Sequence, residues 1–287
     1  MPDKTLITRF APSPTGHLHL GHAYAALFAE AAARDTGGRF LLRIEDIDTS
    51  RARSEFEQAI FEDLAWLGLE WEEPIRRQSE HMTDYERALD RLRSMDVVYP
   101  CFCTRAKIRA EIAGSPRAPH GPDGPLYPGT CKSLSKDERD ARQVEGQAFA
   151  LRLNSFVAMR MLNERAGGPV TWRDMVAGEH AVDTAKFGDV VIARKEMATS
   201  YHLAVTLDDA LQGVTLVTRG LDLMPATHIH RLLQALLDLP VPQYHHHRLI
   251  TDNAGQQLST RDKATGLRTL RNQGVTAEEV RRIVGML

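Results

Sequence analysis

The stretch that decides the fold is Thr5–Gly16, TLITRFAPSPTG, with the segment His19–His22, HLGH, just after it. Thr5–Phe10 favours a strand, and the two prolines and the glycine that follow stop any regular element. Residues 21–34 are alanine-rich helix formers, and the glycines at 37 and 38 end that helix. A strand, a loop and a helix in this order predict the opening of a parallel α/β sheet.

The same alternation extends along the chain. Arg39–Ile44 is a second predicted strand, and helices are predicted at 54–67 and 83–95. The α/β pattern returns at 148–153, 189–194, 201–207 and 214–219, before a helix at 226–237 and a capped helix ending near Val284. Residues 100–147 break the pattern with a Pro/Gly-rich stretch. We therefore expect 1–99 and 148–247 to form two halves of one domain, 100–147 an insertion and 248–287 a helical tail.

Composition limits the class of protein. The 287 residues are 43% hydrophobic and carry a formal net charge of −2, so they can bury a core and are not coated in basic patches. The N-terminus does not read as a signal peptide, and no apolar run approaches the ~20 residues that cross a bilayer. Three cysteines do not suggest a disulfide framework. The expectation is a soluble cytoplasmic protein with no membrane partner.

The histidine segment suggests phosphate chemistry. A helix start offers unpaired N–H groups and the positive end of the helix dipole, and Gly16 and Gly21 let the backbone approach a ligand. His19 and His22, three residues apart, could both reach a nucleotide and donate hydrogen bonds to an α-phosphate. Taken alone, two histidines at this spacing are more typical of surface residues, or of metal ligands without a catalytic role.

The longer pattern resembles one family. Residues 8–16 with 19–22 are similar to the class I glutamyl-tRNA synthetases, whereas the glutaminyl enzymes typically read PPEPNG in this loop. Further similar segments follow in the family's order, at 42–49, 188–191, 201–204, 208–209 and 219–223. The resemblance implies a Rossmann-type catalytic domain that activates glutamate with ATP and Mg²⁺.

By resemblance, Arg9 and Arg219 would hold the carboxylates of glutamate, Glu45 would face its ammonium group, and Tyr201 would close the pocket. Taken singly, each of these charges is also typical of a solvated surface. Asp46 and Asp48 could be a solvated acidic loop or partners for Arg43 and Arg51. The implied glutamate site comprises Arg9, Phe10, Ala11, Pro12, Ser13, Glu45, Tyr201 and Arg219, and the implied ATP and catalytic site comprises His19, Gly21, His22, Ser259, Thr260 and Arg261.

The cysteines form a C-x-C pair, Cys101 and Cys103, with Cys131 downstream. Structural zinc takes four ligands, so His120, Asp123 or Tyr127 could supply the fourth, and three reduced thiols without metal are the alternative. The segments 99–104 and 127–131 resemble the zinc insertion of the shorter glutamyl-Q tRNA(Asp) synthetases. In that family the fourth ligand is a tyrosine, which implies Tyr127 here.

Two departures from full glutamyl-tRNA synthetases refine the prediction. Only about 25 residues follow the last motif, where those enzymes continue into an anticodon-binding region. The resemblance to the glutamyl-Q family therefore implies transfer of glutamate to queuosine in the anticodon of tRNA-Asp, by a monomer. The family's Lys-Met/Leu-Ser-Lys loop is replaced by Gln257–Arg261, QLSTR, in which Arg261 could compensate for the missing lysines.

Two alternatives stay open at this point. The first is a truncated glutamyl-tRNA synthetase that charges a tRNA 3′ end. The second is a catalytically impaired paralogue that binds glutamate and RNA.

Overall fold

The computed structural model describes residues 5–113, 120–121, 124–166, 168–197, 199–251 and 266–287. Its first sheet is parallel and joins β1 (Ile7–Phe10), β2 (Arg39–Ile44) and β3 (Glu72–Arg77) in the order β1-β2-β3. The predicted opening of a parallel α/β sheet is confirmed.

A second sheet continues from β1. It runs β11 (Leu216–Gly220), β12 (Gln243–His247), β8 (Thr171–Asp174) and β9 (Gly178–Ala181), and only β8 and β9 pair antiparallel. β11 lies beside β1, and the Thr215 N–H at its start donates to the Ile7 carbonyl at 3.0 Å. In the spatial order β3-β2-β1-β11-β12, the strands that follow β1 in the sequence are added on one side of it, and those that follow β11 are added on the other side. Open α/β sheets bind ligands at such a switch in strand order, here between β1 and β11.

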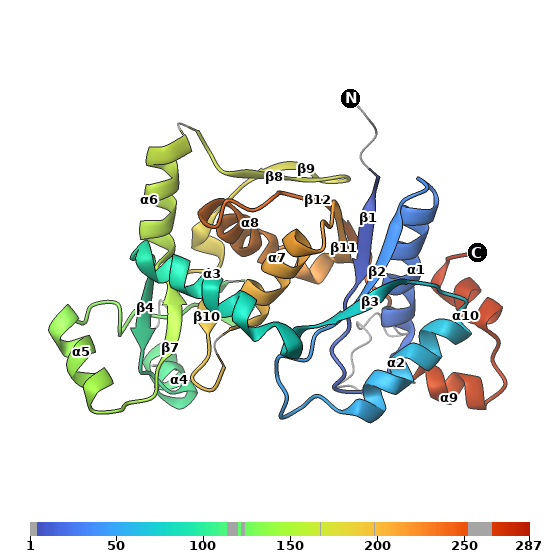
Figure 1. The fold of residues 1–287 in the computed structure, drawn as a ribbon, viewed down its shortest axis with the longest axis horizontal. Coiled ribbons are helices and arrows are strands. Elements are labelled where there is room, and N and C mark those ends of the chain that lie inside the picture. Colours follow the sequence, from blue (N-terminus) through green and yellow to red (C-terminus); the bar gives the residue numbers. More distant parts are fainter. Residues whose placement is uncertain (1–4, 114–119, 122–123, 167, 198, 252–265) are drawn as a thin grey trace.

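Helices cover both sheets. They are α1 (Leu20–Arg34), α2 (Ser54–Trp66), α3 (Met82–Ser94), α6 (Ser155–Ala166), α7 (Tyr201–Leu211), α8 (Ala226–Leu236), α9 (Leu267–Asn272) and α10 (Ala277–Val284). In Figure 1, α1, α2, α9 and α10 gather beside the first sheet, while α7 and α8 lie at the centre beside β11. α1 packs on β1, β2 and α10 through buried alanines and Leu27, so its small side chains bring it close to the strands.

A third sheet lies at the two ends of the predicted insertion, on the far side of the molecule from α1 (Figure 1). β4 (Val98–Cys101), β7 (Ala150–Leu153) and β10 (Val191–Ala193) pair antiparallel in the order β10-β7-β4. The segments 148–153 and 189–194 therefore contain strands, but these strands join β4 rather than the parallel sheet. The remaining elements nearby are α4 (Arg105–Ala113), β5 (His120–Gly121), β6 (Gly124–Pro125) and α5 (Lys136–Val144).

Some elements carry little signal in the sequence. β12 lies between β11 and β8 but reads QYHHH, without the apolar run expected of a central strand. β3, at the edge of the first sheet, reads EEPIRR. The chain also forms three short 3₁₀ helices in its described part, η1 (Gln78–His81), η2 (Thr184–Lys186) and η3 (Leu221–Leu223). Within the described residues, the helices are too short or too polar to cross a membrane.

Candidate active site

A cavity of about 150 Å³ opens where the strand order reverses. Its walls come from the carboxyl ends of β1, β2 and β11 and from the start of α7. The lining residues are Arg9, Phe10, Ala11, Ala25, Glu45, Tyr201, Val205, Thr218, Arg219, Gly220 and Leu223. Six of the eight predicted glutamate-site residues thus line one cavity, and Pro12 and Ser13 follow in the adjoining loop.

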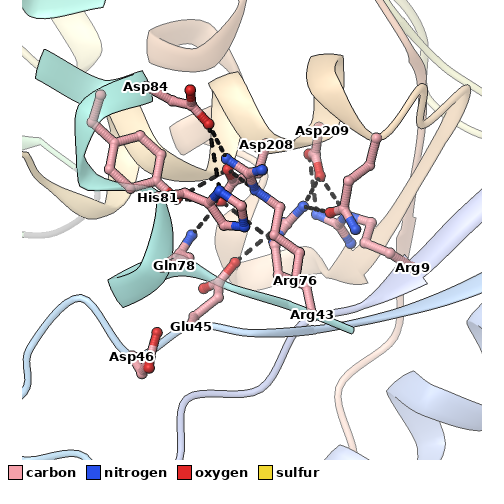
Figure 2. A network of polar contacts seen from close by, with 12 residues as sticks. Arg9, Arg43, Glu45, Asp46, Arg76, Gln78, His81, Asp84, Asp208 and Asp209 are labelled. Carbon is pink, nitrogen blue, oxygen red and sulfur yellow. Dashed lines mark hydrogen bonds and ion pairs between the residues drawn. The ribbon is translucent and has the colours of Figure 1, made fainter. Parts of the chain in front are cut away.

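One wall is a buried network of charges around Arg43, seen in Figure 2. The Arg43 side chain is fully buried, and its guanidinium lies 2.8 Å from Asp209, 3.2 Å from Glu45 and 3.8 Å from Asp208. Burial would lower the pKa of Arg43, but these carboxylates raise it above the ordinary value. Asp208 also accepts from Arg76 at 2.7 Å. Arg43 is therefore compensated inside the protein.

Arg9 shares that network while facing the cavity. Its Nε donates to Asp209 at 2.9 Å and its Nη1 to the Thr218 carbonyl at 3.1 Å. Burial raises the pKa of Glu45, while the guanidinium groups of Arg43 and Arg9 oppose that rise. Glu45 thus brings a carboxylate into a buried cavity wall, where it can accept hydrogen bonds from an ammonium group.

Asp46 and Asp48, beside Glu45, do not have all the partners that the sequence suggested. Arg43 pairs with Asp209, Glu45 and Asp208, so Asp46 and Asp48 are not its partners. Asp46 instead accepts from the backbone N–H and the hydroxyl of Ser79, at 2.8 and 2.6 Å. Asp48 accepts from Ser50 at 2.6 Å.

A second part of the cavity wall, at the end of β11, carries Arg219, which is only 6% exposed. Its Nε donates to Nε2 of His246 at 3.2 Å, Nη1 lies 3.0 Å from Nδ1 of His230, and Nη2 donates to Thr227. No carboxylate of the described residues forms an ion pair with Arg219. Burial and the charge of Arg219 together lower the pKa of His246 to about 4, although Asp174 opposes the fall, and they hold that of His230 well below its usual value. Arg219 is a buried cation among neutral groups, suited to a ligand carboxylate.

Tyr201 stands where three cavities meet. Besides the first cavity, it lines one of about 150 Å³ that also contains Ser13, Glu45 and Asp48. It also lines the largest of the three, about 320 Å³, between the second half of the chain and Tyr127 of the insertion. Burial raises the pKa of its hydroxyl, so Tyr201 is a neutral hydrogen-bonding group. Tyr201, which the resemblance predicts to close the glutamate pocket, thus lines the cavity that contains Arg9, Glu45 and Arg219.

The two histidines of the first loop cap their own helix. Nδ1 of His19 accepts from the Gly21 N–H at 3.1 Å, and Nδ1 of His22 accepts from the His19 N–H at 3.2 Å. Burial lowers the pKa of both rings, that of His22 to about 3. A neutral imidazole whose Nδ1 accepts must carry its proton on Nε2. Each ring therefore presents one N–H donor, and a Cβ on Gly21 would stand 3.0 Å from the His19 ring.

The second part of the predicted ATP site, with Ser259, Thr260 and Arg261, lies outside the described residues. The chain is described again from Gly266, which bridges to His19. The Leu267 N–H donates to the Leu18 carbonyl at 2.8 Å.

The three cysteines converge in the insertion. The sulfur atoms of Cys101, Cys103 and Cys131 lie within 4.8 Å of one another, and those of Cys103 and Cys131 are 3.4 Å apart. The Tyr127 hydroxyl lies 3.4 Å from Cys101 and 3.6 Å from Cys103. Zn–S bonds of ~2.3 Å in a tetrahedron put sulfurs about 3.8 Å apart, so this donor set fits such an ion. Asp123 and the His120 side chain lie outside the described part.

Several residues of this site carried no assigned role in the sequence. Asp209 was visible only within the Asp208–Asp209 pair, and Thr227 and His230 lie in a helix with no motif of their own. In β12 the three consecutive histidines alternate faces, so His245 and His247 pack on Phe28 while His246 alone points toward Arg219. The run of three histidines, whose faces alternate in a strand, was the available sequence signal for a residue beside Arg219.

Comparisons with known proteins agree with this geometry. The family model for class I tRNA synthetases (E and Q), catalytic domain, matches residues 5–287. The chain is 49% identical over 283 residues to the glutamyl-Q tRNA(Asp) synthetase of Rhodobacter capsulatus, covering 98% of this chain and 100% of that protein. It is 40% identical to a protein of the same name from Nitratidesulfovibrio vulgaris, covering 97% and 85% respectively.

A solved glutamate-tRNA synthetase from Elizabethkingia anophelis superposes with a TM-score of 0.74 at 30% identity. The match covers 90% of this chain and 53% of that protein, so the chain spans about half of its length.

Proposed function

The chain belongs to the class I tRNA synthetases of the glutamate and glutamine type, and from this premise we propose that it activates L-glutamate with ATP and transfers the glutamyl group to queuosine in the anticodon of tRNA-Asp. The observation that carries the proposal is the 49% identity over the full length of a relative that bears the glutamyl-Q name. The cavity chemistry supports the amino acid, because it combines a buried uncompensated cation with a buried carboxylate.

In the proposed pocket, Arg219 and Arg9 bind the carboxylates of glutamate and Glu45 accepts from its ammonium group. Phe10, Ala11, Pro12, Ser13 and Tyr201 complete the walls. The Arg219 wall supports this arrangement because its lining of imidazoles leaves the positive charge for the ligand. A substrate carboxylate in that place would gain a charge-assisted pair without competing with an internal acid.

The first step joins glutamate to AMP. A carboxylate oxygen attacks the α-phosphorus of ATP, the bond to the β-phosphate oxygen breaks, and pyrophosphate leaves. The Nε2–H groups of His19 and His22 donate to the α-phosphate, and Gly21 lets the backbone approach. Mg²⁺ would neutralise the phosphate charge. By the family resemblance, Ser259, Thr260 and Arg261 are proposed to stabilise the leaving pyrophosphate.

In the second step a hydroxyl oxygen of the queuosine ring attacks the glutamyl carbonyl, and AMP leaves as the hydroxyl loses its proton. The RNA is proposed to enter through the cavity of about 320 Å³ that adjoins Tyr201. Arg152, Lys186 and Arg194 line that cavity, so its charge suits a phosphodiester backbone.

We propose the cytoplasm as the compartment, where ATP and tRNA are available, and a monomer as the working unit.

We further propose that Cys101, Cys103, Tyr127 and Cys131 hold a structural zinc ion. Zinc thiolates would hold together the segments on either side of α4. Metal analysis of the purified protein should find about one zinc per chain, and Cys131→Ser should lose it. An equal zinc content in both proteins would contradict the assignment.

Two measurements test the proposed function. Glutamate-dependent exchange of pyrophosphate into ATP reports the first step, and its absence would leave the impaired-paralogue reading. Mass spectrometry of tRNA-Asp after reaction with labelled glutamate reports the second. Label on the anticodon base supports the proposal, whereas label on the terminal adenosine supports the truncated glutamyl-tRNA synthetase.

A further inference from the structure

The strongest unassigned feature is a series of buried hydrogen bonds that links Arg219 to His246 and Asp174. The Nε2 atom of His246 accepts from Arg219 at 3.2 Å, and the Nδ1 atom of the same ring lies 2.7 Å from a carboxylate oxygen of Asp174. Asp174 is 2% exposed and His246 is 7% exposed. This series of hydrogen bonds therefore leads from Asp174 on β8 through His246 on β12 to Arg219 on β11, which lines the cavity.

The chemistry of each group fixes the direction of these bonds. A guanidinium has only donors, so Nε2 of His246 must accept and the ring proton must sit on Nδ1. That proton then faces Asp174. The Asp174 carboxylate is itself held by the N–H groups of Val176 and Ala177, both at 2.8 Å, and by that of His246 at 3.1 Å. Its position does not depend on a ligand.

A second arm extends from the other side of the guanidinium. Nδ1 of His230 lies 3.0 Å from Nη1 of Arg219, and its Nε2 lies 3.2 Å from Nδ1 of His202. By the same rule Nδ1 of His230 accepts, and its Nε2–H donates to His202. Thr227 accepts from Nη2. These contacts use three of the five guanidinium donors, leaving one on each terminal nitrogen of a side chain that lines the cavity.

From this geometry we propose that Asp174 and His246 are positioning residues that orient Arg219 for the side chain or main-chain carboxylate of the amino-acid substrate. The inference rests on the proposed function. Asp174 fixes the tautomer of His246, and His246 then offers a lone pair to Nε, so the guanidinium turns its two remaining donors into the cavity. With the opposite tautomer, an N–H would face the Nε–H of Arg219, and the guanidinium would have to rotate.

Replacements at the two positions test this chain. Asp174→Asn can keep the contacts to Val176 and Ala177 with its oxygen, but it then turns an NH₂ group toward Nδ1 of His246. His246→Ala removes the acceptor, and His246→Gln restores one within reach of Arg219. The control is His245→Gln, the neighbouring residue on the opposite face of β12, which packs on Phe28.

Pyrophosphate exchange should show a KM for glutamate raised about tenfold to a hundredfold in Asp174→Asn and His246→Ala, since a hydrogen bond to a charged group is lost. The KM for ATP should stay within about twofold, and His246→Gln should recover part of the loss. In ¹⁵N spectra of histidine-labelled protein, the signal missing from His246→Gln should be that of a neutral ring protonated on Nδ1, and Asp174→Asn should shift it.

The outcomes separate this inference from the proposed function. No exchange in the wild type would overturn the function. With an active wild type, glutamate KM values in the Asp174 and His246 variants that match His245→Gln would overturn the positioning chain. An equal rise in the KM for ATP would do the same, because a general loss of structure would then explain the change. If His246→Ala does not fold, the comparison of His246→Gln with Asp174→Asn decides.

Discussion

Arg43 and Arg219 are both buried arginines on strands of the central sheets, yet their surroundings are opposite. Arg43 lies against three carboxylates, those of Asp209, Glu45 and Asp208. Arg219 lies against two imidazoles and a hydroxyl, with no ion pair to a described carboxylate. A buried charge without a partner is costly, so a compensated arginine contributes to the fold, whereas an uncompensated one is suited to a charged ligand.

This difference separates a wall that holds the molecule together from a wall that receives a ligand. Arg43 connects β2 with α7 across 166 positions of sequence, and its network includes Arg9 at the end of β1. The Arg219 wall has neutral partners that leave two donors unused. Four substitutions or conditions test whether the division is real.

The largest effect is expected for Arg219→Met. Removing the cation leaves a substrate carboxylate in a buried cavity without its partner, so kcat/KM for glutamate should fall about 10³- to 10⁴-fold. Pyrophosphate exchange measures the loss. The free energy of unfolding should change by only about 1–2 kcal/mol, since the hydrogen bonds lost are to neutral groups. Activity near the wild-type value would contradict the proposal that Arg219 binds a carboxylate of glutamate.

Arg43→Met should act on stability. It removes the cation that three buried acids share and leaves Glu45 without its ion pair, while Asp209 keeps Arg9 and Asp208 keeps Arg76. The free energy of unfolding should fall by about 3–5 kcal/mol. Urea unfolding of this variant beside Arg219→Met gives the contrast directly, because the two substitutions are chemically identical. Equal losses of stability in both proteins would show that internal compensation does not distinguish the two walls.

As the pH falls, the stability contributed by the neutral histidines around Arg219 should be lost before that contributed by Asp209. Burial and, to a smaller extent, Arg219 lower the pKa of His246 and His202 to about 4. Below pH 6.5 these histidines are therefore protonated in the unfolded chain but remain neutral in the folded chain. Stability is thus complete above pH 6.5 and falls toward pH 4, by up to about 1.4 kcal/mol per pH unit for each histidine.

Urea unfolding at several pH values measures this slope. Arg219→Met should flatten it, because Arg219 also lowers both pKa values. Asp209 titrates later: burial opposes its ionisation, but Arg9 and Arg43 hold its pKa below the ordinary value of 3.8. The stabilisation that Asp209 contributes is lost only as the pH falls below 3.8. A slope unchanged in Arg219→Met would contradict the account.

The smallest effect is expected for Arg39→Ala. Arg39 pairs with Glu72 at the surface, with about half of its side chain exposed. Solvent screens such pairs, so the loss in unfolding free energy should stay within about 1 kcal/mol. It is the control for Arg43→Met, on the same strand. A loss as large as that of Arg43→Met would show that pairing alone, without burial, sets the cost.

Much of this site could be predicted from the sequence. Arg9, Glu45 and Arg219 follow strand-forming runs, and the carboxyl ends of parallel strands meet at one edge, so their convergence follows from the fold class. The partners could not be predicted. Asp209 lies on a helix far along the chain, and His246 sits in a run of three histidines whose faces only a paired strand can separate.

The same limit explains the strands that sequence reasoning missed. β3 and β12 are too polar to read as buried strands, yet their charged and imidazole side chains find partners supplied by other elements. Arg76 of β3 pairs with Asp208 of α7, and His246 of β12 pairs with Asp174 of β8. Polar strands are stable where tertiary contacts satisfy them.

By itself, the sequence determined the first βα turn and its capped helix, because the bonds between His19, Gly21 and His22 reach only two or three residues along the chain. Tertiary structure alone decided which buried arginine is neutralised. Arg43 and Asp209 are 166 residues apart, and His246 and Asp174 are 72 apart. Coulomb energy depends on distance in space, and the order of strands sets that distance.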